Sequence, residues 1–216
     1  MQKEMPDYQI SAGSDARSAG SLLLTSGILF IIFNTIAEGI YPDFSLKTNA
    51  LSDLGAFGAP TQFLWDGMLL FNGVLGFAGM FFLFRGPALG IGKRKLTSIL
   101  YLLPPIGAII VSVFPENSIL PAMHLLGAFI SFTFGGISAI YAYRFTKSPF
   151  KYFSVILGAV SLAATPLLGS GTSIGFGLVE RLVLYPYIIW SIAFAGYLLA
   201  LSPLSQAMKD RNSGLK

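Results

Sequence analysis

The chain has 216 residues, of which 54% are hydrophobic and only 11% are charged. A soluble domain carries about 25% charged residues, so this composition indicates a protein that lies largely within a membrane. Because the chain has no cysteine and a single histidine, disulfides, thiolate zinc sites, iron–sulfur clusters, covalently attached or bis-histidine haem, and histidine-rich metal sites are excluded.

Six segments are long and apolar enough to cross a bilayer as helices, which takes about 20 residues each. They are predicted at 21–41, 62–84, 97–114, 121–143, 152–169 and 182–202. The longest connection between them is too short to form a domain of its own. The sequence therefore predicts an all-α fold, a polytopic bundle with one six-helix transmembrane domain over residues 21–202. A cytoplasmic segment, 1–20, precedes it, and a cytoplasmic tail, 203–216, follows it.

The basic residues predict the orientation of these spans. All but two of the 14 Lys and Arg residues lie before the first span, after the second, fourth and sixth spans, and so on one side of the membrane; the exceptions are Lys47 and Arg181. Basic residues are enriched on the cytoplasmic side, so both termini are predicted to lie in the cytoplasm, with the protein in the plasma membrane. Their spread over four juxtamembrane segments predicts membrane lipids rather than nucleic acid as partners. A homo-oligomer or a larger membrane complex remains open.

The connection after the first span contains apolar residues spaced three apart. Leu51, Leu54 and Phe57 follow this spacing, and Ser52 or Asp53 is placed to cap a short helix or turn. We expect the three apolar side chains to point inwards. The connection is then either a re-entrant or lid element, or a loop that lies at the membrane interface.

Prolines and small residues characterise the later spans. Pro104 and Pro105 interrupt the third span, where each removes a helical hydrogen bond and frees a backbone carbonyl. The fourth span carries a stripe of small or polar residues at helical spacing, which predicts a surface where helices pack closely. The stripe consists of His124, Ala128, Ser131, Gly135, Ser138 and Ala142. It is expected to turn His124 towards the interior of the bundle.

The acidic residues are concentrated on the side of the membrane opposite to the basic ones. Six of the ten Asp and Glu residues lie there, with the only histidine and one arginine. These eight residues are Glu38, Asp43, Asp53, Asp66, Glu116, Glu180, His124 and Arg181. An ionisable group inside a bilayer costs at least ~2.5–3.5 kcal/mol, so each of them is a candidate for function.

Several of these residues fall in short motifs. The motifs are Glu38-Gly-Ile-Tyr-Pro42, Leu51-Ser-Asp-Leu-Gly55, Phe114-Pro-Glu-Asn117 followed by His124, and Glu180-Arg181 with Trp190 downstream. Together, from about Gly27 to Leu199, they resemble a prokaryotic family of six-span membrane proteins, domain of unknown function 998. The resemblance implies a six-span architecture and marks five positions, but no activity. The marked positions are Ser52, Asp53, Glu116, His124 and Arg181.

The first hypothesis for function is binding or transport at a polar, acidic site near the extracytoplasmic face. The ligand would be a cation, a proton or a lipid headgroup. The predicted site residues are Glu38, Ser52, Asp53, Glu116, His124 and Arg181. Carboxylates with one imidazole suit Mg²⁺, Ca²⁺ or Mn²⁺ better than zinc, so a divalent cation is a candidate cofactor and Asp53, Glu116 and His124 are its candidate ligands.

Two alternatives remain open. In the first, the protein is a structural or accessory membrane subunit, in which Asp53 or Glu116 pairs with Arg181 and His124 bonds to a carbonyl. In the second, it is an intramembrane hydrolase that modifies lipids, with Ser52 as nucleophile, His124 as base and Asp53 or Glu116 as the orienting acid, or with a metal in their place. No nucleophile elbow supports the enzyme, which leaves its catalytic residues unassigned.

Overall fold

The computed structural model describes residues 7–85, 95–171 and 173–213, and the side chains of 14–85, 99–171 and 173–201. Within these residues every regular element is a helix. Six of them are α-helices: α1 (Asp7–Ile40), α2 (Gln62–Arg85), α3 (Lys95–Val113), α4 (Pro121–Tyr141), α5 (Phe150–Ala164) and α6 (Phe176–Ser213). The 3₁₀ turns are η1 (Ser52–Gly55), η3 (Ala142–Arg144) and η4 (Thr165–Gly169). The all-α prediction is confirmed for the described chain.

Five of the helical segments are long and apolar enough to cross a membrane. They are Ser14–Ile40, Gln62–Arg85, Pro121–Arg144, Phe150–Gly169 and Phe176–Leu201. Between them, Ile99–Val113 forms a shorter apolar helix, so the third span remains a prediction. The first and last helices are longer than the predicted spans of 21–41 and 182–202, because hydropathy marks where apolar surroundings begin and not where the helix begins.

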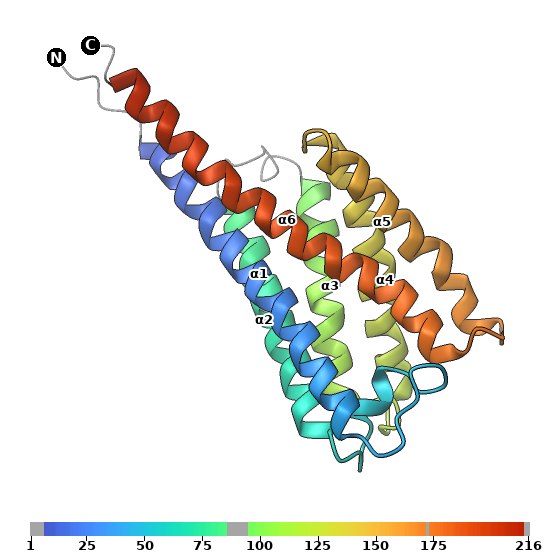
Figure 1. The fold of residues 1–216 in the computed structure, drawn as a ribbon. Coiled ribbons are helices and arrows are strands. Elements are labelled where there is room, and N and C mark those ends of the chain that lie inside the picture. The colour runs from blue at the N-terminus through green and yellow to red at the C-terminus, as the bar shows by residue number, and fades with distance from the viewer. Residues whose placement is uncertain (1–6, 86–94, 172, 214–216) are drawn as a thin grey trace.

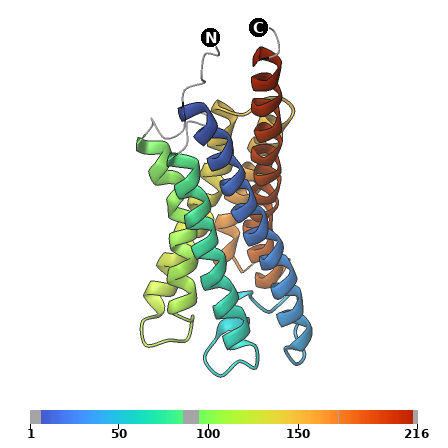
Figure 2. The same cartoon turned by 90° about the vertical axis from the view of Figure 1, so that its left-hand side faces the viewer.

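The six helices form a closed ring. Each one packs against the next along the chain, and α6 packs against α1, so the first and last helices of the chain are neighbours (Figure 1). The connections 41–61 and 114–120 and the one between η4 and α6 gather at one end, which we call the loop end. The connection 142–149, the start of α1 and the end of α6 lie at the opposite end, as the view turned by 90° also shows (Figure 2).

Close approach of the helices depends on the small residues of α4. The stripe predicted for this helix is buried at His124, Ser131, Gly135, Ser138 and Ala142, and Ala128 is half-buried. On α3 next to it, a Cβ atom placed on Gly107 would lie 2.5 Å from the carbonyl oxygen of Gly127. The two backbones therefore touch, which confirms the prediction of a packing surface that turns the histidine inwards.

Serines of α4 also satisfy backbone carbonyls of α3 around its two prolines. Because Pro104 has no amide hydrogen, the carbonyl of Leu100 lacks its helical donor, and the hydroxyl of Ser138 donates to it at 3.1 Å. The hydroxyl of Ser131 donates to the carbonyl of Pro104 at 2.9 Å.

Candidate functional site

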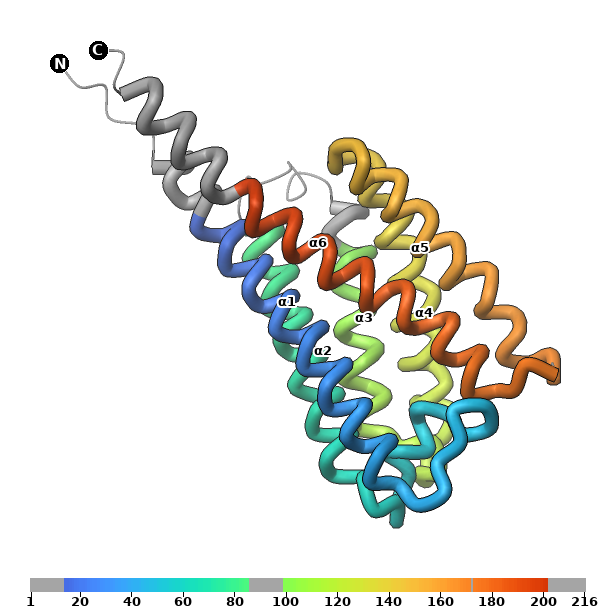
Figure 3. Tube along the Cα trace, viewed as in Figure 1, coloured from blue at the N-terminus to red at the C-terminus, as the bar shows by residue number. Residues whose placement is uncertain are grey.

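The connection 41–61 folds back onto the loop end of the ring, between the ends of α1 and α6 (Figure 3). Leu51 and Leu54 are only 1% and 0% exposed, in a core cluster with Phe30 and Trp65, whereas Phe57 is 54% exposed. The expectation that these side chains point inwards is therefore confirmed for the two leucines and wrong for Phe57. The 3₁₀ turn η1, with three residues per turn, aligns Leu51 with Leu54 but ends at Gly55.

Arg181 fastens this connection to the helices. Its Nη2 atom lies 2.6 Å from Oε1 of Glu38 on α1, and the two side chains are 8% and 16% exposed. Its Nη1 atom donates to the carbonyls of Leu46 and Asn49 in the connection, at 3.4 and 3.1 Å, and to that of Gly177 at 2.8 Å. The guanidinium therefore ties α6, α1 and the connection together.

The predicted pairing of Arg181 with Asp53 or Glu116 is wrong. Its partner is Glu38, in the last turn of α1, because α1 is the direct neighbour of α6 in the ring. Asp53 is engaged within its own connection, where Oδ2 accepts hydrogen bonds from Nδ2 of Asn49 at 2.8 Å and from the amide of Ala50 at 3.0 Å.

Glu38 belongs to a second polar network, which joins three helices. Nδ2 of Asn34, one turn earlier on α1, donates to Oε1 of Glu38 at 3.0 Å and to the hydroxyl of Tyr185 on α6 at 3.1 Å. The indole of Trp65 on α2 donates to Oδ1 of Asn34 at 3.2 Å. Asn34, Trp65 and Tyr185 were not among the predicted site residues; only the i,i+4 spacing of Asn34 and Glu38 signals this network in the sequence.

One hydrogen-bonded group at the loop end consists of Ser52, Asp53 and Glu116. All three are predicted site residues. The carboxyl of Glu116, in the connection 114–120, is hydrogen-bonded to the side chains of Ser52 and Asp53. Burial raises the pKa of Glu116 above its ordinary value of 4.5, and Asp53 raises this pKa further, whereas the hydrogen bond to Ser52 lowers it. The carboxyl of Glu116 therefore binds a proton more tightly than an isolated glutamate does.

Glu180, on α6, also faces inwards at the loop end. It is 7% exposed, and its Oε2 atom accepts a hydrogen bond from the amide of Leu51, 129 residues away in the sequence. This contact fixes η1 to α6 independently of Arg181. Glu180 was not among the predicted site residues, although it is one of the eight ionisable residues that the sequence places on this side of the membrane.

His124 is buried, and its hydrogen bonding defines the tautomer. Nδ1 lies 2.9 Å from the carbonyl oxygen of Phe114, which can only accept, so Nδ1 donates and Nε2 of the neutral ring remains an acceptor. The carbonyl partner expected in the structural hypothesis is thus present. Ser52 is hydrogen-bonded to Glu116, and His124 is hydrogen-bonded to the carbonyl of Phe114. Neither of these is the hydrogen bond between Ser52 and His124 that a nucleophile–base pair requires.

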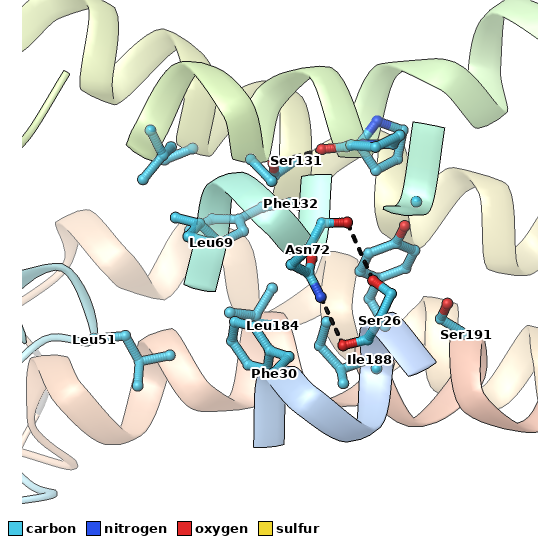
Figure 4. A pocket seen from close by; sticks show the side chains of 18 of the residues that line it. Ser26, Phe30, Leu51, Leu69, Asn72, Ser131, Phe132, Leu184, Ile188 and Ser191 are labelled. Atoms are coloured by element: carbon cyan, nitrogen blue, oxygen red, sulfur yellow. Dashed lines mark hydrogen bonds between the residues drawn. The ribbon is translucent and has the colours of Figure 1, made fainter. Parts of the chain in front are cut away.

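These inward-facing groups border a central cavity between the helices. The cavity offers about 80 Å³ of space for the centres of water molecules and is lined from α1, α2, α3, α4, α6 and η1. Ser52, His124 and Glu180 lie at its loop end, and most of the wall beyond them is apolar. Figure 4 shows Phe30, Leu69, Leu184 and Ile188 along this wall.

Deeper in the cavity, the polar groups largely satisfy one another. The hydroxyl of Ser26 donates to the carbonyl of Asn72 at 3.2 Å, and Nδ2 of Asn72 donates to the carbonyl of Ser26 at 2.9 Å (Figure 4). The hydroxyl of Ser131 is bonded to α3. A ligand would therefore meet polar groups at the loop end and, deeper in the cavity, the hydroxyls of Tyr187 and Ser191.

The arrangement does not resemble a metal centre. In the described part of the chain, no three His, Asp or Glu side chains are grouped so that they could hold a metal ion. The predicted metal ligands Asp53, Glu116 and His124 thus do not form such a group. Asp53 and Glu116 lie together with Ser52, whereas Glu38 is paired with Arg181. His124 and Ser52 both line the cavity.

Comparison with known proteins identifies the family but no function. No curated protein and no solved structure matches the chain. One family model matches residues 24–197, a range that includes every predicted site residue and the whole lining of the central cavity apart from Leu23. The chain therefore belongs to the family described as protein of unknown function (DUF998).

Proposed function

We propose that the protein crosses the plasma membrane six times, with both termini in the cytoplasm, and binds an amphiphilic lipid in its central cavity. α3 occupies a place in the ring equivalent to those of the five longer helices, and its 19 residues extend about 28 Å, close to the thickness of the bilayer core. Arg85, Arg144, Lys147 and Lys151 lie at the end opposite the loop end, which favours a cytoplasmic position for that end.

The observation that carries this proposal is the composition of the cavity wall. A small number of polar groups at one end and apolar side chains along the rest are typical of a pocket for a small amphiphilic molecule. The hydroxyl of Ser52, Nε2 of His124 and the carboxyl of Glu180 are the groups available to a headgroup. The apolar wall offers a tail surroundings similar to those of the bilayer core.

Glu38 and Arg181 have a structural role in this proposal. Their ion pair and the carbonyl contacts of Arg181 hold the connection 41–61 over the loop end. Asp53 and Glu116 are fixed beside Ser52 and shape the polar border of the cavity. Ligand binding and the ion-pair network therefore belong to different residues of the predicted site.

The proposal is tested by filling the cavity. Ala128 lines it from α4, so Ala128→Phe is expected to displace a lipid, whereas Ala163→Phe adds the same side chain to an exposed position of α5. After incubation with a bacterial lipid extract, native mass spectrometry should show one bound lipid on the wild type and on Ala163→Phe, and none on Ala128→Phe. A wild type without bound lipid, or equal occupancy in all three proteins, would refute the proposal.

A further inference from the structure

The shape of the central cavity limits the kind of ligand that fits, and the charge at its loop end limits the headgroup. We propose that the ligand is a single-chain amphiphile whose headgroup donates hydrogen bonds and carries no negative charge, with its tail directed from Glu180 towards Met80. This inference rests on the proposed function, since it names the class of lipid that the same cavity would take.

The cavity is long enough for one lipid tail. Trp65 and Met80 line it at two levels of α2 and are separated by roughly 22 Å along the helix axis, at 1.5 Å per residue. The tail of a lipid spans one leaflet, which is roughly half of a 30 Å bilayer core. The cavity therefore accommodates a complete tail between the polar groups at its loop end and its apolar far end.

The width of the cavity admits one chain and not two. Spread over this length, 80 Å³ for the centres of water molecules corresponds to a tube roughly 2.5 Å in radius once the 1.4 Å radius of water is added. Non-bonded carbon atoms approach to about 3.5–4.0 Å, so one hydrocarbon chain needs a tube roughly 2 Å in radius. Two parallel chains need about twice that width, so the average width favours a single-chain amphiphile over a two-chain phospholipid.

The charges around the loop end disfavour an anionic headgroup. Glu180 is the acid among the residues that line the cavity, and the charges of Arg181, Glu116 and Asp53 act on it from outside the lining, that of Arg181 most strongly. The described basic side chains of this end are Arg181, which is paired with Glu38, and Lys47, which is exposed; neither lines the cavity. A phosphate or carboxylate would therefore contact the Glu180 side chain, with no Lys or Arg in the lining to bind it.

The hydrogen-bond acceptors that border the cavity favour a headgroup that donates hydrogen bonds. Nε2 of His124 accepts in the neutral tautomer, and the Glu180 carboxyl has an oxygen beyond the one that accepts from Leu51. An amine or a hydroxyl group supplies the hydrogens that these atoms lack, and an amine adds attraction to the acid. A headgroup with acceptors only would leave them without a partner.

The test uses the purified full chain in a neutral detergent, with 16-carbon probes that differ only in the headgroup: hexadecylamine, hexadecanol and palmitate. Native mass spectrometry at pH 7 is expected to show one amine or alcohol per chain, with palmitate bound at least tenfold more weakly. A dipalmitoyl phosphatidylethanolamine probe should not bind in the cavity.

Two variants assign the binding to the cavity. Ala128→Phe should abolish it while Ala163→Phe retains it, and Glu180→Gln, which keeps an acceptor for Leu51, should remove the preference of the amine over the alcohol. If palmitate binds as tightly as the amine, or the two-chain lipid competes for the same site, this inference is overturned while the proposed function stands. If none of the amphiphiles binds, or if Ala128→Phe binds as the wild type does, both are refuted.

Discussion

Replacing Arg181 with methionine is expected to destabilise the protein strongly, because it removes the centre of the loop-end network. The guanidinium pairs with Glu38 at 2.6 Å and donates to three backbone carbonyls, and both ionised side chains are largely buried. Loss of one partner of a buried pair costs about 3–5 kcal/mol, since the other charge is left uncompensated. Asn34 still donates to Glu38 in the variant, so we expect the lower half of this range.

The free energy of unfolding can be measured by titrating SDS into detergent micelles, following the loss of helix. Lys47→Met is the matched control, because Lys47 lies in the same connection but is exposed, and a surface change of this kind stays within about 0.5 kcal/mol. The double variant Glu38→Leu, Arg181→Met leaves no buried charge and should lose less than the sum of the two single changes. Stability of Arg181→Met within 1 kcal/mol of the wild type, like the control, would refute the reasoning.

Two further changes test other parts of the loop end and the ring. The folded state binds a proton at Glu116 more tightly than the unfolded state does, so the free energy of unfolding should fall as the pH rises from about 4.5 through the raised pKa. Glu116→Gln should flatten this dependence in the same SDS titration, and an unchanged slope would contradict the raised pKa. Gly107→Ala should cost about 1–3 kcal/mol, because its Cβ atom would lie 2.5 Å from the carbonyl oxygen of Gly127. Gly196→Ala, with nothing within 4 Å, should instead leave stability equal or higher, as measured by thermal unfolding; equal losses for both glycines would rule out the backbone contact as the cause.

The sequence was a good guide to features that depend on one helix at a time. Apolar length predicted six spans, five of which are helices long and apolar enough to cross a membrane, and the spacing of small residues predicted the buried face of α4 with His124 on it. The i,i+4 spacing of Asn34 and Glu38 likewise corresponds to a hydrogen bond of 3.0 Å. In each case the relevant partners lie on the same helix, so helical geometry alone determines the result.

Features that depend on which helices are neighbours were beyond the sequence. Arg181 had several acids on its side of the membrane as candidate partners, and only the closure of the ring by α1 and α6 selects Glu38. Glu180 and Arg181 are adjacent in sequence but point about 100° apart on the helix, so one borders the cavity and the other fastens the connection. The cavity has walls from five helices, and no single stretch of sequence carries a pattern for it.

The pairing of the first helix with the last has a consequence for biosynthesis. Glu38 and its partner Arg181 are 143 residues apart, so the acid emerges from the ribosome well before the arginine. At 5–20 residues per second, this interval lasts roughly 7 to 30 s. During it, the acid is in the membrane or the insertion machinery without its counter-ion, and the bundle can only close once the final helix has been inserted. A chain truncated before α6 would thus leave an unpaired carboxylate for quality-control proteases to recognise.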